Sequence, residues 1–389
     1  MNTVFLRVIE ADDKSIALLE AVRDPERARG RQRFEVDTSS FAHVPRSPFA
    51  YWVSGRLRGL FRELPPFEAD RRAARQGLAT ADDFRFVRAW WAISGHEIAM
   101  RYFAIVKGGR FAPYYADVPA VVNWESDGVE LKAWASSLYN ESHWSRILKN
   151  TDLFFRPGLT WPLRGVRFSA QAVPQGCIFS VAGKMAFADT NELPWYLALF
   201  NASSFDKFIA FFAGKIGGVQ YEVGLIQSVP VPRASAEASL SVSNQGRQAW
   251  SLRRSLDTRT EISHAFTLPI LLQVAGANAE SRAMAWSART RAIVTELARL
   301  QVEIDQHCFE LYGIDQVDRH AITEGFGTSA SDEASNGEGS CSEDDAAEDA
   351  DEADTDAGST ALTAELVSWA VGATFGRFDV RLATGAQPM

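Results

Sequence analysis

The chain has 389 residues, of which 46% are hydrophobic and 23% charged, a composition typical of a folded protein with room for two or three domains. Its net charge of -9 is unevenly spread, because residues 332–356 contain 12 Asp or Glu and neither Lys nor Arg. The remainder holds 40 basic against 37 acidic residues and need not repel a polyanion, and no apolar run of about 18 residues or basic leader predicts a membrane span or a signal peptide.

The first block, residues 1–75, opens with an alternating run from Thr3 to Val8 that is typical of a strand. Asp12 is the expected N-cap of a helix that carries three apolar residues on one face, Ile16, Leu19 and Val22. Ser47-Pro48 predicts the start of a second helix, which Pro65-Pro66 ends. Its expected inner face consists of Trp52, Leu57, Leu60 and Phe61.

The second block, residues 76–235, is rich in aromatic residues and in short strands separated by Gly and Pro. Expected strands lie at 102–106, 120–123 and 176–181, and a single helix is expected from about residue 192 to 213. The block ends in a proline-bounded segment, 229–232.

The third block, residues 236–327, is expected to be helical, and its strongest signal runs from 283 to 311. Apolar residues recur there at spacings of three and four, which predicts a long amphipathic helix ending at Gly313. They are Ile293, Leu297, Leu300, Ile304, Cys308 and Leu311. The acidic segment 328–360 is expected to be disordered, and a last helix is expected at 362–374.

Metal and nucleophile motifs are missing. His96-Glu97 is followed by Met100 instead of a second His, so the HExxH pattern of zinc proteases fails, and no GxSxG, Walker A or GxGxxG pattern occurs. Three well-separated cysteines, Cys177, Cys308 and Cys341, argue against a disulfide scaffold and fit a reducing cytoplasm. We therefore expect no metal site.

Characteristic aromatic, Gly and Pro residues recur in a fixed order at 47–52, 77–88, 90–91, 107–111, 114–115, 121–125, 158–162, 174–180, 199–203, 221–224, 226–232 and 375–384. This order resembles the C-terminal half of the large adenine-specific DNA methyltransferases of BREX (the PglX type) and DISARM defence systems. Residues 196–232 also resemble the end of a target-recognition domain in restriction specificity subunits, for which the helix at 283–311 is the candidate spacer.

The resemblance implies an α+β fold, with a strand-rich target-recognition domain, flanking helices and a long amphipathic spacer helix. The implied division is a connector (1–75) following an absent methyltransferase domain, a target-recognition domain (76–235), a helical spacer region (236–327), a disordered acidic linker (328–360), and a C-terminal helix with a truncated tail (361–389).

The implied function is DNA-sequence recognition for an adenine-N6 DNA methyltransferase of a cytoplasmic, restriction-modification-like antiviral system. Such enzymes hold the target adenine with Asn, Asp or Ser followed by Pro-Pro and an aromatic residue, whereas this chain has Leu64-Pro65-Pro66-Phe67. Because Leu64 cannot accept a hydrogen bond, we expect this chain alone to be inactive, with S-adenosyl-L-methionine required only at the family level. The expected partners are double-stranded DNA, a methyltransferase catalytic domain or subunit, and other defence proteins. The alternative is a non-catalytic scaffold subunit that uses the long helix for docking.

Twelve residues are candidates for DNA contact: Lys107, Arg110, Tyr114, Tyr115, Asn123, Trp124, Thr160, Trp161, Arg164, Lys215, Gln220 and Tyr221. The cations beside Gly108-Gly109 suit phosphate, and the aromatic and amide side chains suit bases. Three other interpretations stay open: a hairpin turn with solvated charges at 107–110, a core role for the aromatic residues, and plain connecting loops at 158–164 and 214–221.

Overall fold

The computed structural model describes residues 2–8, 11–30, 32–138, 142–213, 219–324 and 358–384. Most of the predicted acidic linker, together with Cys341, lies outside these residues. The described elements confirm the predicted α+β class, because helices of up to 34 residues accompany several small sheets. None of the described helices combines the length and the apolar composition needed to cross a bilayer.

The N-terminal part is built on an antiparallel pair, β1 (Asn2–Leu6) and β2 (Arg33–Asp37). Its helices are α1 (Lys14–Arg23), α2 (Pro25–Ala28) and α3 (Gly55–Glu63). Asp13, not the expected Asp12, caps α1 by accepting hydrogen bonds from the backbone N of Ser15 and Ile16. The apolar residues expected on one face of α1 are exposed, and the helix buries Ala17 and Ala21 instead.

The predicted helix start at Ser47 is wrong. Ser47 has a φ of 48°, in the left-handed region, which no α-helix tolerates. The helix begins at Gly55 because the side chain of Ser54 accepts a hydrogen bond from the backbone N of Leu57 (3.1 Å). Leu57 and Leu60 are buried as expected.

Two four-stranded sheets follow, with strand orders β10-β5-β6-β4 and β3-β11-β7-β9. The first consists of β4 (Val87–Ala89), β5 (Tyr102–Val106), β6 (Ala120–Asn123) and β10 (Ile178–Phe179), and α4 (Asp83–Phe86) and α5 (Glu125–Ser137) lie beside it. The second consists of β3 (Ala73–Arg75), β7 (Gly158–Thr160), β9 (Gln171–Val173) and β11 (Met185–Phe187). A small pair, β8 (Arg164–Gly165) and β12 (Val219–Gln220), completes this region.

The single helix expected over 192–213 is two helices, α6 (Leu193–Phe200) and α7 (Ser203–Ala213). The break lies at Asn201, whose side-chain Oδ1 accepts from the backbone N of Ala170 (3.0 Å) and whose Nδ2 donates to the carbonyl of Ala170 (2.9 Å). The side-chain amide of Asn201 therefore forms the two hydrogen bonds with the backbone of Ala170 that a neighbouring strand would form. A short helix, α8 (Val223–Ser228), leads to the proline-bounded segment.

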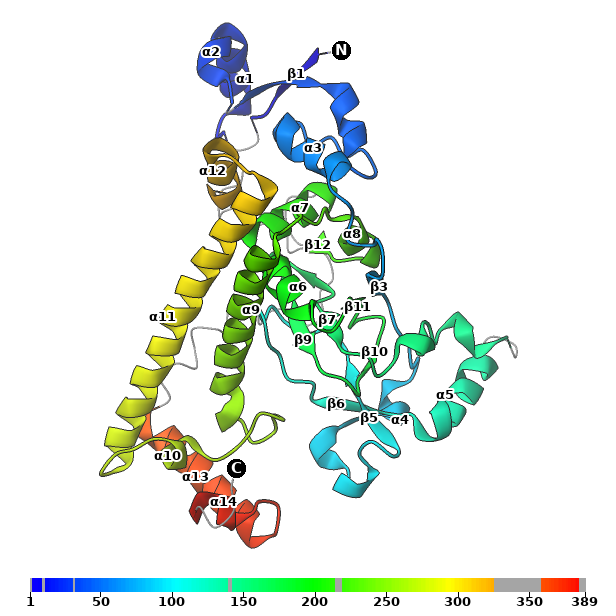
Figure 1. The fold of residues 1–389 in the computed structure, drawn as a ribbon, viewed down its shortest axis with the longest axis vertical. Helices are drawn as coiled ribbons and strands as arrows, with labels where there is room; N and C mark the ends of the chain where they lie inside the picture. Colours follow the sequence, from blue (N-terminus) through cyan, green and yellow to red (C-terminus); the bar gives the residue numbers. More distant parts are fainter. Residues whose placement is uncertain are drawn as a thin grey trace.

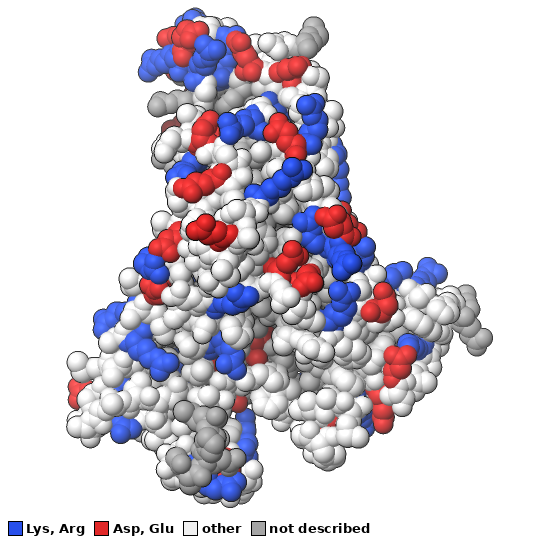
Figure 2. All heavy atoms as spheres, in the orientation of Figure 1, with Lys and Arg blue, Asp and Glu red and all other residues white. Residues whose placement is uncertain are grey.

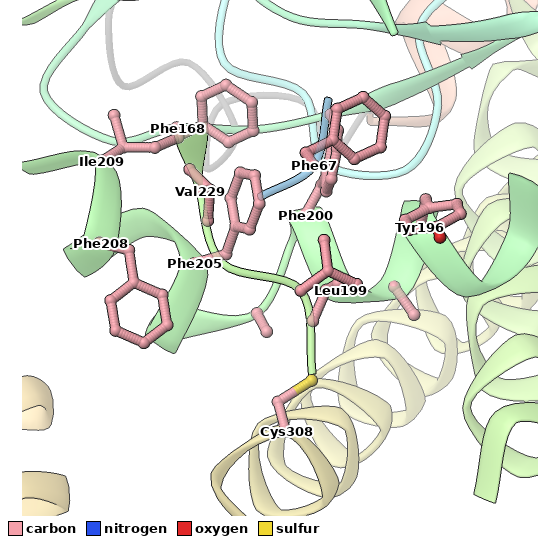
Figure 3. Packing of buried hydrophobic residues seen from close by; sticks show 14 of the residues in the cluster. Phe67, Phe168, Tyr196, Leu199, Phe200, Phe205, Phe208, Ile209, Val229 and Cys308 are labelled. Carbon is pink, nitrogen blue, oxygen red and sulfur yellow. The ribbon is translucent and has the colours of Figure 1, made fainter. Parts of the chain in front are cut away.

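A long antiparallel helix pair, α9 (Ala236–Leu256) and α11 (Ala279–Tyr312), runs along one side of the sheets (Figure 1). The predicted stripe on α11 is confirmed, since Leu300, Ile304 and Cys308 are at most 1% exposed. Gly313 ends α11 in the left-handed conformation, with φ of 63°. In Figure 3, the side chain of Cys308 points from α11 toward the aromatic core that contains Phe200 and Phe205.

The remaining helices are α10 (Ile270–Gln273), α12 (Gln316–Glu324), α13 (Ser359–Thr374) and α14 (Val380–Thr384). The buried apolar residues form three clusters. The first joins the N-terminal part, the second sheet, α6–α9 and α11; the second joins the first sheet to α5; the third joins α10, the start of α11 and α13. Together these clusters hold the loops of the two sheets in fixed positions.

Candidate nucleic-acid interface

Loops that are far apart in the sequence meet at one edge of the two sheets. A Cβ atom placed on Gly108 would lie 2.7 Å from the carbonyl oxygen of Ala182 and 3.6 Å from the backbone N of Leu163. The carbonyl of Leu163 accepts from the backbone N of Tyr221 (2.9 Å), and Gln220 pairs with Arg164 between β12 and β8. Residues 107–112, 163–167, 180–184 and 219–222 therefore form one surface, called here the loop surface.

The loop surface is rich in cations. Its first three segments contain five basic residues and no Asp or Glu: Lys107, Arg110, Arg164, Arg167 and Lys184. Outside this surface the charges are mixed, and Figure 2 shows Lys and Arg interspersed with Asp and Glu over most of the face in view.

Two of these cations are held by carboxylates from neighbouring segments. Lys107 pairs with Asp83, and the nearly buried Lys184 donates to Oε2 of Glu222 (2.8 Å). Burial acts to raise the pKa of Asp83, but hydrogen bonds from Lys107 and Thr80 lower it below its usual value. The hydrogen bond from Lys184 likewise lowers the pKa of Glu222. Both carboxylates are therefore ionised at neutral pH, and the two Lys residues brace the loops.

Arg110 and Arg164 are exposed, and neither forms an ion pair with any residue that the structure describes. Gln220 is exposed and donates to Glu222. Lys215 lies outside the described residues. The guanidinium groups of Arg110 and Arg164 are thus the predicted side chains that the loop surface offers most directly to a phosphate.

Arg167 was not expected from the sequence but lies on the same surface. Its guanidinium lies over the ring of Phe111, 4.9 Å from the ring centroid, and so links segment 163–167 to segment 107–112. The signal in the sequence was the acid-free run 163–170, which carries two Arg residues.

The two glycines of segment 107–112 differ in their surroundings. Gly108 has a φ of 75° and lies so close to Ala182 that a side chain would collide with its carbonyl. Gly109 has a φ of 147°, and no atom lies within 4 Å of the place a Cβ would take. The free space around the backbone of Gly109 is suited to close approach by a phosphate group.

Tyr114 and Tyr115 belong to the packing between the sheets and the helix pair. Tyr114 is 3% exposed and donates its hydroxyl hydrogen to Oε1 of Gln301 on α11 (2.6 Å). Tyr115 is half-buried and donates to Oδ2 of Asp257 (3.3 Å). Burial raises the pKa of both hydroxyls, which therefore stay protonated donors. Neither ring is open to a base in this structure.

The other candidates selected for base contact are also in the core. Trp161 and Tyr221 are at most 1% exposed, and Nε1 of Trp161 donates to the carbonyl of Tyr221 (3.1 Å). Trp124 packs on Phe154, and Thr160 donates to the carbonyl of Lys184 (2.9 Å). Asn123 donates to Oε2 of Glu130 (3.1 Å). We leave these five residues, with Tyr114 and Tyr115, out of the interface proposed below.

The only Pro-Pro pair has a structural role. The backbone of Pro65 and Phe67 pairs with that of Val231 and Val229, and the ring of Phe67 is 1% exposed in the first cluster. Residues 64–67 therefore do not fit an adenine pocket, and we derive no methyl-transfer step from them. Among the described residues, no three His, Cys, Asp or Glu side chains are placed to hold a metal ion.

The chain is similar in sequence to two curated proteins, although no family model matches it. The adenine-specific methyltransferase PglX of Lacticaseibacillus casei (strain Zhang) is 24% identical over 334 residues, 79% of this chain. The adenine-specific methyltransferase BrxX of Escherichia coli O9:H4 (strain HS) is 25% identical over 237 residues, 56% of this chain.

A solved structure of the Type IIL restriction-modification enzyme MmeI in complex with DNA matches 67% of this chain and 36% of its own, with a TM-score of 0.43 and 13% identity. The sequence relatives are much longer than this chain, which spans 26% of PglX and 18% of BrxX. Over most of its length, the chain is similar in sequence to a part of the adenine-specific methyltransferases PglX and BrxX.

Proposed function

We propose that this chain is the DNA-recognition part of an adenine-specific DNA methyltransferase in a bacterial antiviral system, and that the loop surface binds the DNA backbone. The observation that carries the proposal is the convergence of three acid-free segments at one edge of the sheets, where Arg110, Arg164 and Arg167 are exposed and form no ion pair with a described residue. The similarity to PglX and BrxX supports it from the sequence side.

The proposed chemistry is phosphate neutralisation. Arg110 and Arg164 contact phosphates, which displaces condensed counterions and makes the affinity fall with salt. The open backbone at Gly109 approaches a third phosphate. Methyl transfer itself requires a catalytic domain or subunit that binds S-adenosyl-L-methionine and holds the target adenine, because residues 64–67 do not fit an adenine pocket. The proposed location is the cytoplasm, where such a complex meets DNA.

Fluorescence anisotropy of the chain on a random labelled duplex, titrated from about 50 to 200 mM salt, tests the proposal. We expect binding that weakens steeply with salt. Arg110→Ala and Arg164→Ala should each weaken binding and lower the magnitude of the slope of log K against log salt by about 1, because each removes one phosphate contact.

The matched control is Arg23→Ala, which removes one exposed cation from the last turn of α1 in the N-terminal part. It changes the net charge by the same amount and should leave the slope unchanged. If it weakens binding as much as Arg110→Ala does, the net charge and not the loop surface governs binding. If the folded wild-type chain binds no duplex at the lowest salt, the proposal is wrong.

The alternative function, a scaffold that docks partners through the long helix, loses its main support in the structure. The apolar stripe of α11 packs inside this molecule against α9, α6 and α7. It is therefore not available to a partner.

A further inference from the structure

Two phenylalanines lie two residues apart in the short helix α4, and they face opposite ways. Phe86 is 1% exposed and packs in the second cluster, whereas Phe84 is 94% exposed. Single exposed apolar side chains are common on protein surfaces and mean little by themselves. What sets Phe84 apart is the way it is held and the place where it is held.

The turn that presents Phe84 is tightly fixed. Asp82 accepts a hydrogen bond from the backbone N of Arg85 (3.0 Å), and Arg88 donates to the carbonyl of Phe84 itself (2.6 Å). Trp134 donates to the carbonyl of Thr80 (3.1 Å). Ala81 has a φ of 55°, a left-handed conformation that a residue with a Cβ rarely adopts. The chain thus holds a strained backbone in a turn whose tip is a bare aromatic ring.

The same turn adjoins the loop surface. Asp83, the residue before Phe84, accepts hydrogen bonds from Lys107 and Thr80. Upstream, the carbonyl of Leu78 accepts from the backbone N of Val181, within segment 180–184 (2.9 Å). The turn that carries Phe84 therefore adjoins the loop surface at Lys107 and at segment 180–184.

The charged side chains around Phe84 balance one another. Asp82 is occupied as the cap of α4 and Asp83 by Lys107, while Arg85 pairs with Glu130 (2.8 Å). Arg88 is exposed and forms no ion pair among the described residues. The three negative charges of Asp82, Asp83 and Glu130 balance the three positive charges of Lys107, Arg85 and Arg88, so the distinctive contribution of the turn is the aromatic ring.

We propose that Phe84 is a base-stacking residue, whose ring inserts at an unstacked base step of the duplex bound on the loop surface. Every base has a π-face, so an aromatic ring stacks on any of them, and apolar wedges insert between base steps of distorted duplexes. Unstacking costs least where pairing is already broken. This inference rests on the proposed DNA binding and adds the contact that senses duplex distortion.

The test compares a fully paired duplex with the same duplex carrying one central mismatch, using the full chain and its Phe84→Ala and Phe84→Trp variants. We expect the wild type to prefer the mismatched duplex. Phe84→Ala should lose roughly tenfold in affinity for it, the value of one base–aromatic stack, and lose the preference. Phe84→Trp should keep both. The salt slope should be the same in all three, because no charge changes.

The control is Phe375→Ala, which removes a ring that is 86% exposed just after α13, away from the loop surface. It should bind both duplexes like the wild type. If Arg110→Ala weakens binding while Phe84→Ala is indistinguishable from the wild type and from Phe375→Ala, the stacking role is overturned and DNA binding by the loop surface stands. If the wild type binds neither duplex, both proposals fail together.

Discussion

Asp206 on α7 is a carboxylate used inside the molecule. Its Oδ1 accepts a hydrogen bond from the backbone N of Phe168 (2.8 Å) and so fixes the loop that follows β8. Burial raises the pKa of Asp206 above its usual value, despite this hydrogen bond and the nearby charges of Lys207 and Arg167. The hydrogen bond stabilises the folded state, whereas the burial of the negative charge destabilises it.

We expect Asp206→Asn to be as stable as the wild type at pH 7, or more stable. A carboxyl whose pKa is raised on folding binds its proton more readily in the folded than in the unfolded chain. Its contribution is therefore fully present at low pH and is lost as the pH rises from about 4 through the raised pKa. Urea unfolding between pH 4 and 8 should show that the stability difference between variant and wild type shifts in favour of the variant across this range.

Asp206→Ala is the companion variant, because it removes the charge and also the acceptor. It should be about 1–3 kcal/mol less stable than Asp206→Asn at every pH, the penalty for leaving the backbone N of Phe168 without a partner. Equal losses for the Asn and Ala variants at pH 7 would show that the charge itself stabilises the fold, contrary to this expectation.

At the scale of elements, α11 is the part of the fold that the sequence predicted best. Six apolar residues at spacings of three and four specify one stripe on a helix, and a Gly that adopts a positive φ specifies its end. The break between α6 and α7 had no such signal. It depends on Asn201 pairing with the backbone of Ala170, a contact between residues that the sequence does not place together.

Leu300→Ala should destabilise the molecule by about 2–5 kcal/mol, since it opens a cavity where α11 packs in the first cluster. Leu300 is 1% exposed, whereas Val302 on the other side of the same helix is 69% exposed. Val302→Ala should therefore change the stability by less than about 0.5 kcal/mol. The midpoint of urea unfolding measures both, and comparable losses would mean that the exposed side of α11 also carries packing.

Some features of the candidate site could be predicted from local sequence, whereas others depend on contacts between distant residues. Charged residues at glycine turns are almost always at the surface, so the sequence located Arg110 and Arg164 in exposed loops. An aromatic side chain, in contrast, can pack in a core or stack on a base. The sequence alone could therefore not decide whether Trp161 and Tyr221 are buried or exposed. That segments 107–112 and 163–167 adjoin follows only from the way the two sheets pack.

At the scale of the whole molecule, the three apolar clusters are distinct. The third cluster is small and lies at the end of the long helix pair that is far from the N-terminal part, where α13 packs on α10 and on the start of α11 (Figure 1). Leu362 is 0% exposed there, and none of the loops proposed to bind DNA contributes to this cluster. Local loss of this packing is therefore expected to leave the rest of the fold in place.

Leu362→Ala tests this independence. Removing a buried Leu should cost about 2–5 kcal/mol, and the loss should fall on the third cluster alone. Hydrogen exchange is then expected to speed up in α13 and α10 and to stay unchanged in β5, β6 and the middle of α11. Val367→Ala, on the same helix but at a residue that is 57% exposed, should alter neither the stability nor the hydrogen exchange. Faster exchange throughout the chain in Leu362→Ala would instead mean that the three clusters unfold as one cooperative unit, and the loop surface would then depend on the C-terminal helix for its stability.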